Sequence, residues 1–523
     1  MQRVVRYCLL LFFLLAGTGK IGAQPLAGSY RNPIVHADYS DPDAIRVGDD
    51  YYMVASSFNH VPGLPVLHSK DLVQWELIGY ALQRLVPEEH YRTVQHGGGV
   101  WAPAIRHHNG LFYIFFPDPD FGIYIITASD IRGPWSEPFL LLPGKGLIDP
   151  CPFWDNNGKA YLVHAYAGSR AGIKSILVVR EMDPGCKSVT GAPVLVYDGG
   201  TSDPTVEGPK LYKRNGYYYI FAPAGGVTNG WQLALRSRSV YGPYERKVVL
   251  HQGTSRINGP HQGAWVQTPA GADWFLHFQD KGAYGRILHL QPMRWQNDWP
   301  VMGEAGQPVQ QFQLPHPGNR QTGLREPEQT GRASWPLTWQ WAANPGEGWG
   351  FLLSAGGIRL YARQQPDSLH SLWMTPNILS RMFPAEEFTA TATLDIRPHT
   401  TGERFGLIIT GRDYATLELE QSPEGMVLRQ MICRDADKGG REREIARLPA
   451  GNSRFYLQVR VAAGAVCRFY FSENGSSYQA IGQPFTARPG VWVGARLGLF
   501  AVRSKATNDA GYADLHRFIA ETR

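Results

Sequence analysis

The sequence predicts an all-β protein in which a five-bladed β-propeller is followed by a β-sandwich. Three observations support this. Short apolar and aromatic runs bounded by Gly, Pro, Asn and Asp fill the chain, and no long amphipathic pattern interrupts them. In the first part, a turn, a short apolar strand, a second turn and an aromatic strand recur five times. In the last part, apolar and polar residues alternate, as in half-buried strands.

The first element is a leader, residues 1–23. It has a basic start, an apolar run over residues 8–15 and small residues at its end, which together predict a cleavable secretory signal. The apolar run is too short to span a bilayer. We therefore expect an exported protein, periplasmic or extracellular, without a membrane span.

Removing this leader also changes the charge. Arg3, Arg6 and Lys20 leave with no acidic residue, which lowers the formal net charge from +6 to +3. A charge this small removes the main argument for a nucleic-acid partner. The aromatic content of 12%, with 15 Trp and 25 Tyr, favours a ligand with flat, weakly polar faces such as a sugar ring.

The second element, residues 28–310, carries the repeat. If Tyr52, Tyr113, Tyr161, Tyr218 and Trp274 are equivalent positions, the steps between them are 61, 48, 57 and 56 residues. A trailing segment that ends in an aromatic residue recurs as well, so each unit holds about four strands. Four-stranded units repeated in this way bury their faces against one another and close into a propeller. Five units predict five blades.

Residues 311–331 are rich in Gly, Pro and Gln and are predicted to be a linker, and residues 332–523 are predicted to form a two-sheet sandwich. Asn474-Gly475 is a predicted hairpin turn in that domain. Cys433 and Cys467 either pair or stay as two buried thiols, and both readings remain open. The cysteine spacings match no zinc pattern.

The residues that open the five repeats are candidates for chemistry, because the innermost strand of each blade starts at one end of the central channel. They are Asp41, Trp101, Asp149, Glu207 and His261. A structural role would repeat one residue type in this position, whereas unlike types indicate separate functions. Three carboxyl groups, an aromatic residue and a histidine would then share a pocket.

Carboxyl pairs are what glycoside hydrolysis needs, since one protonates the leaving oxygen while the other activates water or attacks the ring. Like charges in a partly dry pocket raise the pKa of one member, which then serves as the acid. Glu207 is our candidate for the general acid because its longer side chain can reach sideways to the bridging oxygen. Asp41 is then the base, and Asp149 orients Glu207 and tunes its proton.

Asn32-Pro-Ile, Asp41-Pro-Asp, Trp101-Ala-Pro, Asp149-Pro and Glu207-Gly-Pro resemble the motifs of glycoside hydrolase family 43, in the same order over about residues 30–299. The region that begins at Trp335-Pro-Leu-Thr-Trp resembles the concanavalin A-like sandwich attached to the β-xylosidase and α-L-arabinofuranosidase branch of that family. The resemblance implies a five-bladed propeller and an inverting mechanism.

The resemblance also implies roles for single residues. Asp41 matches the general base, Glu207 the general acid and Asp149 the pKa-modulating, orienting acid. Substrate contacts fall on four further residues, namely Phe58, Trp101, His261 and Arg286. In some members the axial histidine, here His261, lies near a structural Ca²⁺, whereas no cofactor is required for catalysis. Ala104 and Ile287 depart from the pattern, because many members have an acid at each position.

These features predict an exo-acting, inverting glycosidase that removes terminal L-arabinofuranose or D-xylose from plant cell-wall oligosaccharides and polysaccharides. Arabinofuranosidase activity is ranked first and β-xylosidase activity is the alternative. A hypothesis from another class is a carbohydrate-binding propeller without turnover, which would have no need of three converging acids. A third is that the sandwich binds sugar by itself, although the alternation of Trp339 and Trp341 favours packing.

Overall fold

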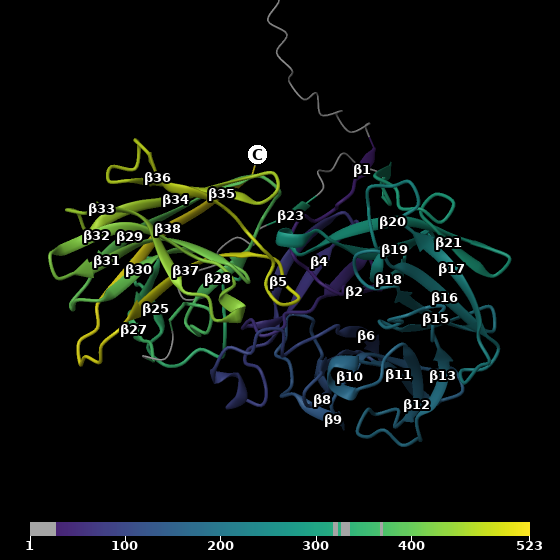
Figure 1. The fold of residues 1–523 in the computed structure, drawn as a ribbon. Helices are drawn as coiled ribbons and strands as arrows, with labels where there is room; N and C mark the ends of the chain where they lie inside the picture. Colours follow the sequence, from purple (N-terminus) through teal and green to yellow (C-terminus); the bar gives the residue numbers. More distant parts are fainter. Residues whose placement is uncertain (1–27, 317–322, 326–334, 367–369, 523) are drawn as a thin grey trace, which may run out of the picture.

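Two all-β lobes lie side by side in the computed structural model (Figure 1). It describes residues 28–316, 323–325, 335–366 and 370–522. The predicted leader, residues 1–23, lies outside the described residues. In the part of the chain that is described, no helix is both long and apolar enough to cross a membrane.

The first lobe is the predicted five-bladed propeller, built from antiparallel sheets whose strands pair in chain order. The first blade contains β2 (Asp43–Val47), β3 (Asp50–Val54), β4 (Gly63–Ser69) and β5 (Gln74–Leu82). The second contains β6 (Ala104–His108), β7 (Leu111–Asp118), β8 (Gly122–Ala128) and β9 (Phe139–Pro143). The third contains β10 (Leu147–Trp154), β11 (Ala160–Tyr166), β12 (Ile176–Met182) and β13 (Val194–Asp198).

The remaining two blades follow the same plan. The fourth contains β14 (Lys210–Arg214), β15 (Tyr217–Ala224), β16 (Trp231–Ser237) and β17 (Glu245–His251). The fifth contains β18 (His261–Gln267), β19 (Asp273–Asp280), β20 (Arg286–Gln296) and β21 (Trp299–Met302). Helical structure in the described residues is limited to α1 (Gly168–Ala171) and short 3₁₀ turns at His90–Arg92, Gly282–Tyr284 and Ala436–Lys438.

The aromatic strands that mark the repeat supply the packing between blades. A separate hydrophobic cluster fills each of the interfaces between neighbouring blades, including the one between the fifth and the first. Inner-strand side chains add hydrogen bonds around the ring, such as Arg106 to Asp43, Arg106 to Cys151, the Leu211 N–H to Cys151, the Trp265 N–H to Tyr212, and Arg46 to the Gln267 carbonyl. These contacts hold the inner strands, and thus the channel end, in a fixed arrangement.

The segment expected to be a linker takes part in the propeller. β22 (Gln311–Gln313) pairs with β1 (Ser29–Arg31), and β23 (Gly323–Arg325) pairs in parallel with β5. The segment expected to be a linker therefore contains two short strands. Its composition is that of a loop, but an unpaired strand and an open blade edge provide backbone partners that composition does not reveal.

The second lobe is a sandwich of two sheets. The eight-stranded sheet contains β24 (Gln340–Trp341), β28 (Leu379–Met382), β37 (Arg496–Arg503), β30 (Glu403–Thr410), β31 (Tyr414–Ser422), β32 (Gly425–Cys433) and β33 (Glu442–Pro449), with β27 (Arg363–Gln364) beside β37. The seven-stranded sheet contains β25 (Gly350–Leu352), β26 (Ile358–Tyr361), β38 (Tyr512–Thr522), β29 (Phe388–Arg397), β34 (Arg454–Ala462), β35 (Val466–Ser472) and β36 (Gln479–Thr486).

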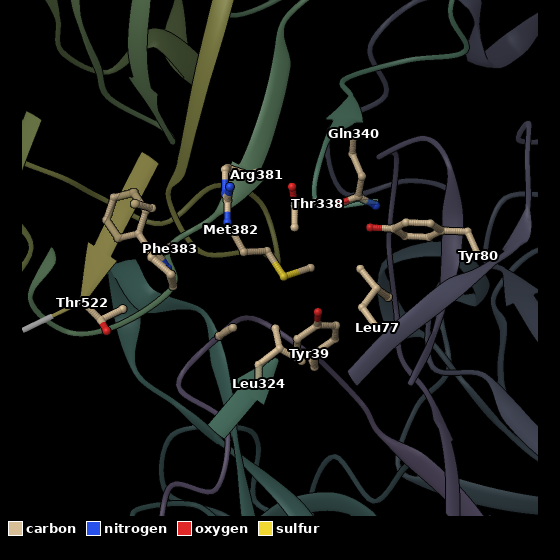
Figure 2. A pocket seen from close by; sticks show the side chains of 13 residues that line it. Tyr39, Leu77, Tyr80, Leu324, Thr338, Gln340, Arg381, Met382, Phe383 and Thr522 are labelled. Carbon is tan, nitrogen blue, oxygen red and sulfur yellow. The ribbon is translucent and has the colours of Figure 1, made fainter. Parts of the chain in front are cut away.

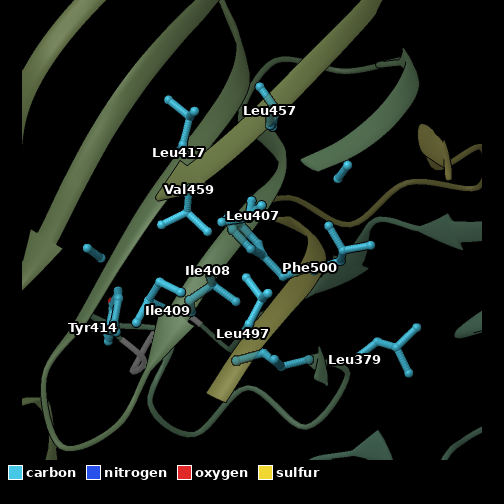
Figure 3. Packing of buried hydrophobic residues seen from close by; sticks show 14 of the residues in the cluster. Leu379, Leu407, Ile408, Ile409, Tyr414, Leu417, Leu457, Val459, Leu497 and Phe500 are labelled. Atoms are coloured by element: carbon cyan, nitrogen blue, oxygen red, sulfur yellow. The ribbon is translucent and has the colours of Figure 1, made fainter. Parts of the chain in front are cut away.

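The inward side chains of both sheets interdigitate in one core, part of which is shown in Figure 3. β29 alternates buried and half-buried positions along its whole length, which is the pattern predicted for these strands. Asn474-Gly475 lies in the connection between β35 and β36, as predicted. Cys433 and Cys467 are two buried free thiols, so the reading in which they pair is excluded.

The two lobes share buried contacts. Trp341 pairs through its backbone with Val61 of the propeller. Ile287, the departure noted above, is buried in the core cluster of the sandwich, where an acid would be costly. Trp339 and Trp341 are only 5% and 7% exposed, so neither offers a surface for a sugar.

Candidate active site

One cavity gathers the residues that open the blades. Its lining includes all seven predicted site residues, namely Asp41, Phe58, Trp101, Asp149, Glu207, His261 and Arg286. It also contains Ala102, Ile148, Val227, Gln262 and Trp492. Residues separated by up to 245 positions in the propeller therefore meet at one end of its channel.

The backbone at the two aspartates turns sharply. Asp41 has φ 54° and Asp149 has φ 56°, a left-handed conformation that Asp tolerates better than most residues. Asp149 also lies in a β-bulge, because the register of β10 on β11 shifts between Ile148 and Cys151. Bulges re-aim side chains next to functional sites, and here both features direct carboxyl groups to the cavity.

Both carboxylate oxygens of Asp41 accept hydrogen bonds from neighbouring side chains. Ser56 Oγ donates to Asp41 Oδ2 at 2.5 Å, and Arg286 Nη1 lies 3.1 and 3.2 Å from the two carboxylate oxygens. The Asp41 and Arg286 side chains are both nearly buried. A charged, doubly anchored carboxylate of this kind is a fixed hydrogen-bond acceptor for a water molecule.

Asp149 is buried and accepts the Gly208 N–H on Oδ2 at 2.7 Å. Burial raises the pKa of Asp149 to about 6, and the negative charge of Asp41 adds to the rise. The Gly208 N–H, Lys210 and Gln262 oppose it. Asp149 therefore remains largely anionic at neutral pH.

Glu207, in contrast to Asp149, keeps its proton at neutral pH. Burial raises the pKa of Glu207 to about 8, with further contributions from the charges of Asp149 and Asp41, against which Arg286 and Lys174 act. His261 Nε2 lies 3.4 Å from Glu207 Oε1, and burial lowers the pKa of His261 to about 3. A protonated Glu207 thus lies beside a neutral imidazole at neutral pH.

Aromatic side chains form a wall of the cavity. The ring centroids of Phe58 and Trp101 are 6.3 Å apart, and those of Trp101 and Trp492 are 6.0 Å apart. The Arg286 guanidinium lies 5.9 Å from the Trp492 ring. Flat apolar faces beside polar groups suit a pyranose or furanose ring.

Trp492 was missed by sequence reasoning. It belongs to the loop between β36 and β37 of the sandwich, about 190 residues after β21, the last strand of the fifth blade. Asp38 holds this loop against the propeller, because its carboxyl accepts the Gly494 N–H at 2.7 Å and the Arg286 N–H at 2.8 Å. The surrounding Arg-Pro-Gly-Val-Trp-Val-Gly carries no signal that would have singled out this tryptophan.

Two models of protein families match this chain. The family model "Glycosyl hydrolases family 43" matches residues 30–300, which is more than half of the chain. This chain belongs to glycosyl hydrolase family 43. The model "Beta xylosidase C-terminal Concanavalin A-like domain" matches residues 332–521. The family 43 chain is therefore a glycosidase of the β-xylosidase and α-L-arabinofuranosidase type, with the sandwich of that branch.

Named relatives cover most of this family 43 enzyme. It is 37% identical over 487 residues to a protein of Xylanibacter ruminicola, covering 90% of this chain and 86% of that one. It is 30% identical to a β-xylosidase of Formosa agariphila, covering 96% and 92%. It is 29% identical to the non-reducing end α-L-arabinofuranosidase BoGH43B of Bacteroides ovatus, covering 81% and 82%.

Solved structures show the same two-domain fold. The xylan β-1,4-xylosidase of Bacillus halodurans superimposes with a TM-score of 0.81 at 25% identity, covering 94% of this chain and all of that one. The family 43 protein BlXynB of Bacillus licheniformis superimposes with a TM-score of 0.80 at 25% identity, covering 95% and 100%.

The surroundings of His261 do not fit a calcium ion held by protein side chains. Both ring nitrogens of His261 are buried without a hydrogen-bond partner. Ca²⁺, however, takes six to eight oxygen ligands, and the described residues contain no group of three or more His, Cys, Asp or Glu that could hold a metal ion.

A second cavity lies between the two lobes of the family 43 enzyme (Figure 2). Tyr39, Tyr80 and Leu77 of the propeller face Arg381 and Met382 of the sandwich across it. No carboxyl group lines it, so it lacks the acid and base that glycoside hydrolysis requires.

Proposed function

We propose that this family 43 enzyme is an exo-acting β-xylosidase that removes terminal D-xylose with inversion, and that it accepts terminal L-arabinofuranose as a second substrate. Arabinofuranose, ranked first on sequence grounds, takes second place because the β-xylosidase of Formosa agariphila matches more of the chain than the arabinofuranosidase of Bacteroides ovatus. The substrate class is pentose-containing oligosaccharides from plant cell walls.

The proposed reaction type rests on one observation, the raised pKa of Glu207 among its neighbouring carboxyl groups. Glu207 holds a proton at neutral pH because its pKa is raised to about 8, so it can protonate the leaving glycosidic oxygen. Asp41, anchored by Ser56 and Arg286, takes the proton of the attacking water. Asp149 is placed to orient Glu207 and keep its proton in place.

The wall of the cavity supports cleavage from chain ends. Phe58 is almost fully buried, and its backbone is fixed by paired hydrogen bonds with Val100. Trp492 adds a wall from the other domain, beside Trp101 and Arg286. A pocket enclosed by both domains accommodates a terminal sugar better than the middle of a chain.

The proposal includes export, on the strength of the predicted leader, and catalysis that needs no metal, because carboxyl groups supply both acid and base. N-terminal sequencing of the secreted protein checks the first point. Dialysis against EDTA checks the second, and turnover is expected to be retained. Loss of turnover that Ca²⁺ restores would contradict it.

The deciding experiment measures kcat/KM on nitrophenyl β-D-xyloside and nitrophenyl α-L-arabinofuranoside, and follows xylotriose hydrolysis by NMR. We expect the xyloside to be preferred, xylose to be released one unit at a time, and α-xylose to form first. Asp41→Asn is expected to lower kcat by a factor on the order of 10²–10⁴. Full activity in this variant would contradict the role of Asp41 as the base, and first-formed β-xylose would contradict inversion. A wild type that binds xylo-oligosaccharides without hydrolysing them would favour a binding propeller.

A further inference from the structure

Gln262 is a cavity residue that neither the motifs nor the proposed roles account for. It lines the cavity together with Asp41, Asp149 and Glu207. Its side chain is buried, with 2% of the residue exposed. Its Nε2 atom is buried and makes no well-formed hydrogen bond, although the carboxamide lies near enough to Asp149 to lower the pKa of that group. A buried amide N–H without a well-formed hydrogen bond destabilises the fold, so this arrangement needs a reason.

The backbone at Gln262 is built in the same way as at the catalytic aspartate of the third blade. Gln262 has φ 39°, in the left-handed region. The register of β18 on β19 shifts between His261 and Gly263, so Gln262 is the bulged residue, as Asp149 lies at the shift in β10. Strain and bulges of this kind accumulate at functional sites.

The neighbours of Gln262 connect it to the acids. Its carboxamide carbon packs so closely on Gly208 that a Cβ there would come within 2.9 Å of it. The N–H of Gly208 is the one that binds Asp149. The Gln262 carboxamide therefore packs on Gly208, which follows Glu207 in the chain and binds Asp149 through its N–H.

We propose that Gln262 is a positioning residue whose carboxamide donates a hydrogen bond to Asp149 when sugar is bound, which keeps Asp149 anionic and Glu207 protonated. The inference rests on the proposed function of these two acids. Catalytic hydrogen bonds are often long in the free enzyme and tighten in the substrate complex, which accounts for a donor that is close to Asp149 and still unpaired.

The direction of the effect on pH dependence follows from the charges. Gln262 opposes the rise in the pKa of Asp149, and anionic Asp149 raises the pKa of Glu207. Without the donor, Asp149 binds a proton at higher pH, so the acidic limb of the kcat profile, which reports the substrate complex, moves to higher pH. Asp149 is still anionic at pH 8 and continues to raise the pKa of Glu207, so the basic limb stays in place. The other groups facing this pair are Asp41, Lys210, Arg286, Lys174 and neutral His261, and a change at Gln262 removes none of them.

The test compares Gln262→Met, which keeps the shape and lacks the donor, with Gln262→Asn, which tolerates the left-handed backbone and withdraws the amide by one methylene. Gln232→Met is the matched control, because Gln232 is equally buried on β16 and lies outside the cavity lining. Each protein is assayed from acid to alkaline pH on xylobiose and on dinitrophenyl xyloside, whose leaving group needs little protonation.

We expect both Gln262 variants to shift the acidic limb of the kcat profile up by about 0.5–1 pH unit. We also expect a loss of about 10-fold in kcat/KM on xylobiose and a much smaller one on dinitrophenyl xyloside. Gln232→Met should change neither. Equal losses on both substrates with an unmoved acidic limb would assign Gln262 to sugar binding or packing and overturn the inference.

The assay also separates this inference from the proposed function. If the wild type prefers arabinofuranosides, the same comparison is made with arabinobiose and dinitrophenyl arabinofuranoside, and the inference is judged on the shift of the acidic limb. A wild type that hydrolyses no pentoside contradicts the proposed function, and the inference fails with it.

Discussion

Glu207 and Asp149 share one cavity but differ in proton affinity because their surroundings differ. Asp149 receives the Gly208 N–H and lies near Lys210, both of which oppose the rise in its pKa. No hydrogen-bond donor opposes the rise at Glu207, where burial and two anionic neighbours act in the same direction. Pairs of acids pushed apart in this way divide the work of acid and base.

This difference makes a prediction for Glu207. Its pKa is raised to about 8, so the acid form persists below that value and kcat/KM should fall as pH rises through about 8. Glu207→Gln is expected to abolish this basic limb and to lower kcat on xylobiose by a factor on the order of 10²–10⁴. Dinitrophenyl xyloside should be affected far less. Equal loss on both substrates would argue against the acid role.

Loops and bulges, rather than whole strands, place the functional groups. The strands form a regular ring, whereas the cavity residues lie where that regularity breaks, in the left-handed turns at Asp41, Phe58 and Asp149 and in the bulge at Gln262. The loop between β36 and β37 adds Trp492 from outside the ring, and Asp38 fixes that loop by accepting the Gly494 N–H. A catalytic propeller and a sandwich thus build one pocket.

A prediction for this loop follows from its aromatic contact. Trp492 is 48% exposed, so Trp492→Ala should leave the melting temperature nearly unchanged. Loss of the aromatic wall is expected to lower kcat/KM on xylobiose by about 10-fold, since an aromatic contact of this kind contributes about 0.5–1.5 kcal/mol beyond buried area. The control is Trp335→Ala, an exposed sandwich tryptophan outside the cavity lining, which should retain full activity. Equal loss in both variants would contradict the role of Trp492.

At the scale of the whole molecule, the two lobes depend on each other. Asn344 of the sandwich satisfies both backbone groups of Leu85 in the propeller, accepting its N–H at 2.8 Å and donating to its carbonyl at 2.9 Å. Val94, Tyr284 and Ile287 of the propeller are buried in the core cluster of the sandwich. Separate folding would expose these apolar groups and leave the backbone groups unpaired.

We therefore expect a single cooperative thermal transition in calorimetry. Asn344→Ala leaves two buried backbone groups unpaired, which costs about 1–3 kcal/mol for each, and should lower the melting temperature of that one transition. Asn452→Ala is the control, because Asn452 is exposed and bonds only within the sandwich. Two separated transitions in the wild type would contradict the dependence of the lobes on each other.

The blade count, the two-domain order and the meeting of Asp41, Asp149 and Glu207 could be predicted from the sequence, because a repeat puts equivalent residues in equivalent places. The strands hidden in the expected linker could not, since β22 and β23 are strands only by virtue of the partners they meet. Whether Cys433 and Cys467 pair also depends on how far apart the fold places them, and in the structure both are free thiols.

The sequence by itself determined a repeat architecture with three acids in its repeated positions, since periodicity and residue type are local properties of the chain. Only the tertiary structure decided which residues complete the cavity. Trp492 comes from another domain, and Gln262 depends on a one-residue bulge. The proton on Glu207 depends on burial and on neighbouring charges, which exist only once residues distant in the chain have been brought together.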